Sequence, residues 1–272
     1  MNFVEKLTFA TRKNKSLLCV GLDTDPKLMP ENISVFEFNK AIIDATADLV
    51  CAYKPNLAFY EAIGNEGLDA LKRTVAYVPK SIPVIGDAKR GDIGNTSKAY
   101  ADALFTYFGF DAATVSPYLG FDSLEPFIRY QDKAIFILCR TSNPGAVDFQ
   151  SLICDFEGNK LPLFEIVAEK ASRWNKSGNV GVVVGATYPD ELKTIRQSHP
   201  DMPILIPGIG AQGGDLATTV RNGVDAYGEK AIINSARQII YASREKSFAI
   251  DARKAAQTVR DQINQELAKL NN

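Results

Sequence analysis

The chain has 272 residues, 46% of them hydrophobic and 10% aromatic, with a formal net charge of −1 at pH 7. This composition is typical of a globular protein, and the near-neutral charge gives no reason to expect nucleic acid or an acidic membrane surface as a partner. No apolar run approaches the ~18 residues of a membrane span, and the first residues lack the features of a signal peptide, so we expect a cytoplasmic protein.

Eight short runs rich in Val, Ile and Leu recur along the chain. They lie at residues 17–23, 49–55, 82–88, 112–117, 134–139, 180–186, 203–208 and 230–236. They lack polar alternation, as expected for parallel strands buried on both faces. Helical patterns lie between most of them, for example at residues 35–49, 96–109 and 161–178. The alternation predicts a (β/α)₈ TIM barrel, with a doubly wound sheet as the alternative.

The domain organisation follows from the same pattern. No linker rich in Pro, Ser or charge divides the chain, so we predict a single barrel domain over residues 1–272. The stretch at residues 140–179 is longer than the other connections and contains LICDFEGNKLP, which we interpret as part of a hairpin insertion.

The cysteines and the single histidine exclude several kinds of site. Cys19, Cys51, Cys139 and Cys154 show no CxxC spacing, so we expect reduced thiols, mostly in the core. His199 lies in the polar turn SHPDMP, where we expect it to be exposed. A Ser-His-Asp triad or a histidine-based zinc site would depend on this one residue. Acid–base chemistry therefore falls to Lys, Asp or Glu.

Charged residues gather where the first three predicted strands end. The first run ends in Asp23, the second in Lys54, and the third in Asp87 and Lys89. Side chains alternate along a strand, so Asp87 and Lys89 share a face with Ile85 and point toward the rim if Ile85 is in the core. Catalytic groups of such barrels lie at the carboxyl ends of the strands. A structural ion-pair network at the barrel mouth is the alternative interpretation.

The loop GIGAQGG, residues 208–214, follows the seventh predicted strand. Its glycines at 208, 210 and 213 match G-x-G-x-x-G, but a nicotinamide site would want an acidic residue after the next strand. That strand is followed by Arg237 instead. Backbone N–H groups of the loop, the Gln212 amide and the Arg237 guanidinium are suited to a phosphate group.

One segment carries a resemblance to a known family. DAKRGDIGNT, residues 87–96, resembles the pattern D-x-K-x-x-D-I-x-x-T of orotidine 5′-phosphate decarboxylases, and its surroundings look like their longer bacterial branch, type 2. The resemblance runs from CVGLDTDP to NSARQIIYAS, nearly the whole chain. It implies a (β/α)₈ barrel that works as a homodimer without metal or cofactor. The implied reaction converts orotidine 5′-phosphate to uridine 5′-phosphate (UMP), the last step of de novo UMP synthesis.

The same resemblance implies the catalytic residues. Asp87 matches the central aspartate of the family's network, and Lys89 matches the lysine that gives a proton to C6 of the pyrimidine. Lys54 looks like the first lysine of that network. Asp92 resembles an aspartate that enters the site of the partner subunit.

The implied substrate-binding residues are Asp23 for the ribose hydroxyls, Ile93 and Thr96 in the partner's site, Ser142 for the pyrimidine, Pro207 at the end of strand seven, and Gln212 and Arg237 for the phosphate. One position departs from the pattern. Many relatives have Gly before the arginine, whereas this chain has Ala236, which puts a backbone contact to phosphate there in doubt.

Two other functions are consistent with parts of the pattern. Sugar-phosphate decarboxylases and aldolases of the same superfamily share D-x-K-x-x-D and use Mg²⁺, but Lys54 and the continuation through Ile93 and Thr96 favour the nucleotide enzyme. A non-catalytic barrel that binds nucleotide phosphates would account for Ser142 and Arg237. It would have no need of a lysine between two aspartates.

Overall fold

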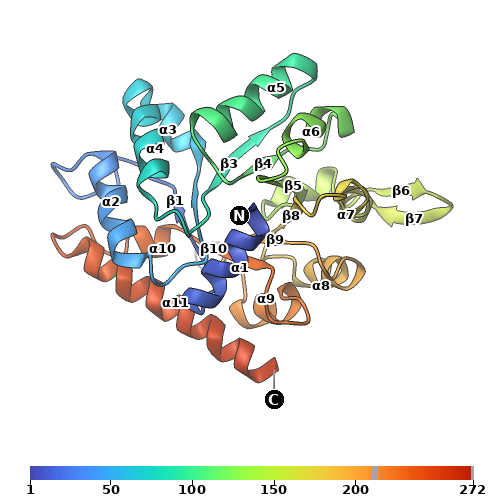
Figure 1. Cartoon of the computed structure of the whole chain (residues 1–272). Coiled ribbons are helices and arrows are strands. Elements are labelled where there is room, and N and C mark those ends of the chain that lie inside the picture. Colours follow the sequence, from blue (N-terminus) through green and yellow to red (C-terminus); the bar gives the residue numbers. More distant parts are fainter. Residues whose placement is uncertain (210–213, 271–272) are drawn as a thin grey trace.

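The computed structural model describes residues 1–209 and 214–270, and its central feature is a parallel eight-stranded sheet curled into a barrel (Figure 1). The strands are β1 Leu18–Leu22, β2 Ala52–Pro55, β3 Ile85–Arg90, β4 Ala112–Val115, β5 Ala134–Arg140, β8 Val180–Val184, β9 Ile204–Pro207 and β10 Ala231–Ser235. Each overlaps one of the eight predicted runs, in the predicted order. The barrel prediction is confirmed and the doubly wound alternative is wrong.

The ring of strands is nearly closed. Its hydrogen-bonded order is β2–β1–β10–β9–β8–β5–β4–β3. Two isolated bridges, Tyr53 with Val84 and Asn56 with Asp87, join the outer strands β2 and β3. Because all the strands run parallel, their carboxyl ends surround one mouth.

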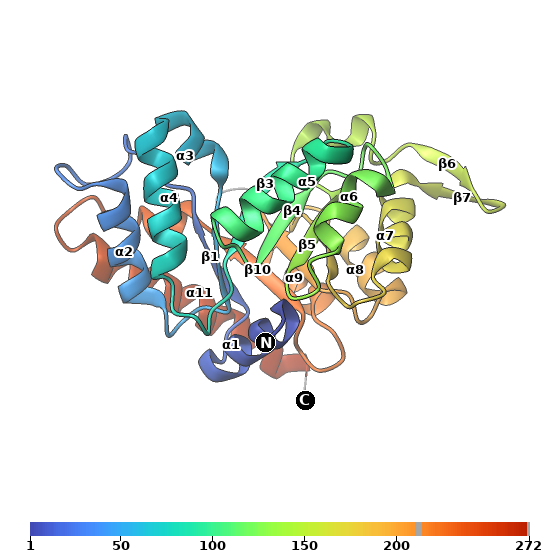
Figure 2. The same ribbon diagram turned by 45° about the horizontal axis from the view of Figure 1, so that its top comes forward.

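Helices surround the barrel (Figures 1 and 2). They are α1 Phe3–Asn14, α2 Val35–Thr46, α3 Leu57–Ile63, α4 Asn65–Tyr77, α5 Gly94–Asp102, α6 Phe121–Ile128, α7 Leu163–Trp174, α8 Pro189–Ser198, α9 Leu216–Gly223, α10 Arg237–Ile240 and α11 Phe248–Leu270. A π-helical turn, Ala103–Tyr107, continues α5, and a 3₁₀ turn, Pro144–Asp148, follows β5. Local sequence explains some of these boundaries: Ser34 and Glu37 form a capping box that starts α2. None of the described helices is long and apolar enough to cross a membrane.

Two apolar cores determine where the mouth lies. The larger core fills the space between the strands and the surrounding helices. The smaller core fills the barrel interior and includes Cys19, Ile85 and Phe136, together with Phe3 and Leu7 from α1. Helix α1 also touches the loops that precede the strands, because Phe3 N–H donates to the Asp132 carbonyl at 3.1 Å. The amino end of the barrel is therefore closed by apolar groups, and the polar residues lie at the other end.

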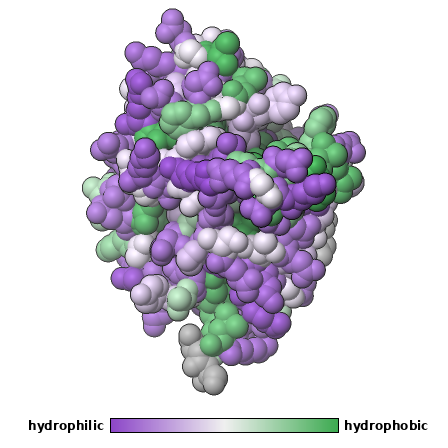
Figure 3. Space-filling model, turned by 90° about the vertical axis from the view of Figure 1, so that its right-hand side faces the viewer, coloured by the Kyte–Doolittle hydropathy of each residue, from purple (hydrophilic) through white to green (hydrophobic). Residues whose placement is uncertain are grey.

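A hairpin projects from the barrel (Figures 1 and 2). Its antiparallel strands are β6 Ile153–Phe156 and β7 Asn159–Pro162, at the place that the sequence suggested. Glu157 and Gly158 both have positive φ, 51° and 83°, as a tight two-residue hairpin turn requires. The ion pair between Arg173 of α7 and Glu157 fastens the turn to the body. The face that carries the hairpin is mostly hydrophilic, with separate apolar patches (Figure 3).

The cysteines are free and mostly buried, as the sequence predicted, whereas His199 is not exposed as predicted. All four cysteines are free, and Cys19, Cys51 and Cys139 are buried. The expectation of an exposed His199 is wrong, because only 9% of its side chain is accessible. His199 ends α8 and lies 4.0 Å from Glu169 of α7, a long-range contact that the local sequence does not reveal. Burial lowers the pKa of His199 below its ordinary value.

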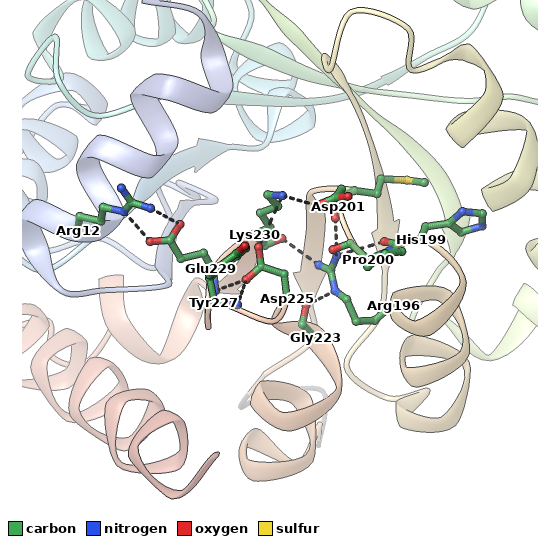
Figure 4. A network of polar contacts seen from close by, with 11 residues as sticks. Arg12, Arg196, His199, Pro200, Asp201, Gly223, Asp225, Tyr227, Glu229 and Lys230 are labelled. Atoms are coloured by element: carbon green, nitrogen blue, oxygen red, sulfur yellow. Dashed lines mark hydrogen bonds and ion pairs between the residues drawn. The ribbon is translucent and has the colours of Figure 1, made fainter. Parts of the chain in front are cut away.

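Arg196 ties several connections together at the amino end of the barrel (Figure 4). It is 7% exposed, and its guanidinium donates to the backbone carbonyls of His199, Pro200, Met202, Gly223 and Lys230. Burial lowers the pKa of Arg196 to about 10, so the group is still charged at pH 7. One side chain thereby joins the end of α8, the end of α9 and the segments that enter β9 and β10.

We predict that Arg196→Met lowers the free energy of unfolding by about 2–4 kcal/mol, because it removes the donor to the buried carbonyls of Gly223 and Met202. Urea unfolding followed by circular dichroism measures the change. Arg12→Met is the matched control, since Arg12 pairs with Glu229 in the same region but its side chain is 68% exposed. An equal loss of stability in both variants would contradict the role given to Arg196.

Candidate active site

The carboxyl ends of the strands surround a cavity of about 600 Å³. Seven residues singled out from the sequence line it: Asp23, Lys54, Asp87, Lys89, Ser142, Pro207 and Arg237. They come from the ends of β1, β2, β3 and β9 and from the segments that follow β5 and β10. The alternation of side chains along the strands thus brings groups far apart in sequence into one site.

Asp87 is the centre of an ion-pair array in this cavity. Its Oδ2 lies 2.9 Å from Lys54 Nζ, and its Oδ1 lies 2.6 Å from Lys89 Nζ. Lys54 Nζ also lies 3.8 Å from Asp23 Oδ1. One carboxylate therefore holds two ammonium groups at defined positions.

The two lysines differ in their access to the cavity. Lys54 is 3% exposed, and its position on β2 places it just above the apolar interior of the barrel. The Lys89 side chain is 50% exposed, although its ammonium touches Asp87. Lys54 is suited to fixing the charge of Asp87, whereas Lys89 is free to meet a ligand.

Charge pairing keeps the array ionised. Burial alone would raise the pKa of Asp87, but Lys54 and Lys89 outweigh this effect and hold it well below its ordinary value. Burial alone would lower the pKa of Lys54, but Asp87 and Asp23 outweigh that effect and raise it. Asp87 and Lys54 therefore present opposite charges side by side at neutral pH.

The predicted site residues that follow β3 lie outside this cavity. Asp92, Ile93 and Thr96 follow β3 and lead into α5, and they are not among the residues that line this cavity. Asp92 Oδ1 accepts from the Ile93 N–H at 2.8 Å, and Ile93 is 57% exposed. Within the described part of this chain, the structure does not bring Asp92 together with Lys89.

The opposite side of the cavity carries the predicted binding residues. Ser142 lies in the loop after β5, Pro207 ends β9, and Arg237 is the first residue of α10, exposed at the mouth. Gln212 lies outside the described residues. The departure at Ala236 has a structural counterpart, because a Cβ at Gly21 would lie only 2.7 Å from the Ala236 Cβ. The glycine on β1 makes room for the methyl group of Ala236, which directly follows the neighbouring strand β10.

Sequence reasoning missed several polar residues that line the cavity, and three of them, Asn56, Thr114 and Asn234, lie at or next to the strands. Thr114 Oγ1 lies 3.0 Å from Asp87 Oδ1. The Asn234 side chain is buried, and its Oδ1 has no hydrogen-bond partner among the described residues. A signal existed for all three, because each lies near the carboxyl end of a predicted strand. In the described part of the chain, no three His, Cys, Asp or Glu residues form a group that could hold a metal ion.

Comparison with known proteins gives one consistent result. The sequence pattern of the Orotidine 5′-phosphate decarboxylase / HUMPS family matches residues 16–251. A protein of Dehalococcoides mccartyi (strain CBDB1), named orotidine 5′-phosphate decarboxylase, is 58% identical over 97% of this chain and 98% of its own length.

Solved structures agree. Leishmania donovani OMP decarboxylase is 41% identical, with a TM-score of 0.85 over 98% of this chain and 99% of that protein. Leishmania donovani UMP synthase is 43% identical, with a TM-score of 0.87 over 98% of this chain. The match spans only 57% of the UMP synthase chain.

We predict that Lys54→Met lowers the free energy of unfolding by about 3–5 kcal/mol at pH 7, because Asp87 then loses its buried partner. The loss should shrink as the pH falls below about 4. In the native protein the pKa of Asp87 lies below its ordinary value of 3.8, so acid removes the stability that this carboxylate contributes. In the variant, Asp87 keeps only Lys89 against the effect of burial, so its pKa lies closer to the ordinary value and acid removes less of its stability. Urea unfolding at several pH values tests this, and a loss that is constant with pH would contradict it.

Proposed function

The chain belongs to the Orotidine 5′-phosphate decarboxylase / HUMPS family, and from this premise we propose that it converts orotidine 5′-phosphate to UMP, the last step of UMP synthesis. The observation that carries the proposal is the array of Lys54, Asp87 and Lys89 inside the cavity. The Dehalococcoides mccartyi protein and Leishmania donovani OMP decarboxylase bear the decarboxylase name and match over 98% and 99% of their own length. This favours decarboxylation over an Mg²⁺-dependent sugar-phosphate enzyme or a non-catalytic barrel.

The reaction has one dominant electrostatic requirement. When the bond between C6 and the carboxylate breaks, its electron pair remains on C6 in the plane of the ring, with no adjacent π system to absorb the charge. Opposite unit charges ~4 Å apart interact by ~4 kcal/mol at an effective dielectric of ~20. A fixed cation beside C6 therefore lowers the barrier substantially.

Lys89 is the group that supplies this cation. CO₂ leaves, the electron pair on C6 takes a proton from the Lys89 ammonium, and the neutral amine regains a proton from solvent. The half-exposed side chain is suited to both steps, because it reaches the cavity and the solvent. Asp87 holds the ammonium in place and favours its charged form.

Lys54 and Asp87 serve the reaction through Lys89. Lys54 keeps Asp87 ionised, and the Asp87 carboxylate faces the place where the substrate carboxylate is lost. Repulsion between these two carboxylates in the bound substrate would add to the rate if it is relieved as CO₂ leaves.

The remaining groups bind the parts of the substrate that do not react. Ser142 contacts the pyrimidine, Asp23 the ribose hydroxyls, and Arg237 with Gln212 the phosphate, while Pro207 forms part of the cavity wall. Support comes from the exposed position of Arg237 at the mouth of the same cavity. Binding energy from the remote phosphate can be used to position the ring at Lys89.

The active form is a homodimer in which Asp92, Ile93 and Thr96 enter the partner's site. These residues lie outside the cavity of their own chain, and the 57% exposure of Ile93 leaves an apolar side chain open to a neighbour. Asp92 then flanks the partner's Lys89 opposite Asp87. The chemistry uses no cofactor or metal, the substrate is a small molecule, and the enzyme works in the cytoplasm without nucleic-acid or membrane partners.

The direct test is the loss of orotidine 5′-phosphate absorbance on addition of the protein. We expect stoichiometric formation of UMP and CO₂, at the same rate with and without EDTA. Activity that EDTA abolishes and Mg²⁺ restores would assign the chain to the sugar-phosphate enzymes. UMP binding without turnover would assign it to the non-catalytic alternative.

The shared site predicts complementation between two inactive variants. Lys89→Ala and Asp92→Ala proteins are mixed equally and allowed to exchange subunits. Each heterodimer has one site that lacks both groups and one site that lacks neither. With random pairing, half of the dimers are mixed, so about a quarter of all sites should regain wild-type character.

Native mass spectrometry measures the fraction of heterodimers, and the absorbance assay measures the regained activity. Each variant incubated alone serves as the control. Heterodimers with no more activity than the parent proteins would show that Asp92 acts within its own chain or has no role.

A further inference from the structure

We propose that Thr114 is a positioning residue for the decarboxylation, because its hydroxyl locks the backbone of Lys89 to the carboxylate of Asp87. The inference rests on the proposed function and adds a residue that the D-x-K-x-x-D segment does not contain. Thr114 lies on β4, is 1% exposed and lines the cavity.

The pairing of β3 with β4 makes room for this contact. Gly86 lies opposite Ala113, but the next paired residues are Arg90 and Val115. Three residues of β3, from Asp87 to Lys89, therefore lie against the single residue Thr114. Such a bulge changes the direction of the residues in it. Here it brings the Asp87 carboxylate and the Lys89 backbone N–H to the same Thr114 hydroxyl.

Lys89 needs support in this position. Its φ is +48°, a left-handed conformation that is costly for residues other than glycine and persists only where the surroundings hold it. The Lys89 N–H donates to Thr114 Oγ1 at 3.0 Å. This bond fixes the backbone from which the catalytic ammonium extends.

Chemistry alone settles the direction of the second bond. A backbone N–H can only donate, so the Thr114 hydroxyl is the acceptor toward Lys89. An ionised carboxylate can only accept, so the hydroxyl hydrogen points at Asp87 Oδ1, 3.0 Å away. The same Oδ1 accepts from Lys89 Nζ at 2.6 Å, which closes a ring through Asp87, Thr114 and Lys89.

The three hydrogen bonds among Asp87, Thr114 and Lys89 explain how the half-exposed Lys89 side chain keeps a defined position. The Asp87 contact alone restrains the ammonium but leaves the strained backbone free to relax. Thr114 restrains both ends of the same residue. Since a misplacement of ~1 Å can cost about a hundredfold in rate, loss of the hydroxyl should act on turnover more than on binding.

The test compares Thr114→Val, which keeps the side-chain shape and removes the hydroxyl, with Thr114→Ser, which keeps the hydroxyl. Binding of UMP measured by calorimetry counts the intact sites, and kcat is expressed per intact site. We expect Thr114→Val to lower kcat by about ten- to a hundredfold with KM changed less than about threefold. Thr114→Ser should stay within about threefold of wild type. Thr46→Val is the matched control, because Thr46 of α2 is equally buried and its hydroxyl donates to the Ile42 carbonyl.

If Thr114→Val does not fold, Thr114→Ala and Thr114→Ser form the equivalent pair, because both lack the methyl group. The inference is overturned if the variant without the hydroxyl turns over within threefold of wild type per site. It is also overturned if the serine variant loses as much activity as the valine or alanine variant, or if Thr46→Val loses as much. Wild-type protein that binds UMP but does not decarboxylate the substrate would refute the proposed function itself, and Thr114 would then have no reaction to serve.

Discussion

Placing one ionised carboxylate between two ammonium groups, at the edge of an apolar interior, is the constraint on which the site depends. Burial opposes the charge of both groups, and it is outweighed at Asp87 by Lys54 and Lys89 and at Lys54 by Asp87 and Asp23. Because this pair is satisfied internally, Asp87 has a second oxygen available for Lys89. Lys54 thus fixes the Asp87 carboxylate, and Asp87 in turn fixes the exposed Lys89 ammonium. A cation that is fixed before the reaction begins is the condition for electrostatic preorganisation.

The barrel supplies the rest of that condition. Phe3 and Leu7 of α1 close the amino end of the barrel, and an apolar core fills its interior, so polar side chains on the inner faces of the strands are confined to the carboxyl end. The two-residue repeat of each strand places an apolar residue directly below a functional one, as Ile85 lies below Asp87. Eight short strands thus position residues from the whole length of the chain around one cavity.

Much of this could be predicted from the sequence, because strand alternation is a local property. The eight strands, their order and seven of the cavity residues follow from apolar runs and the residues that end them. Other features depend on contacts that no local pattern encodes. The burial of His199 depends on α7, and the partners of Arg196 come from two separate connections, α8–β9 and α9–β10. The role given to Thr114 arises from a register shift between β3 and β4. In the proposed dimer the place of Asp92 depends on a second chain, so neither the sequence pattern nor a single subunit determines it.

In the mechanism that we propose, the Lys89 ammonium, held by Asp87, stabilises the negative charge that forms on C6. The most direct measurement is the single-turnover rate of Lys89→Ala with orotidine 5′-phosphate, expressed per site that binds UMP. We expect a fall of at least about a thousandfold, with the UMP stoichiometry and the unfolding midpoint preserved. A rate within about tenfold of wild type, at the same number of intact sites, would contradict it.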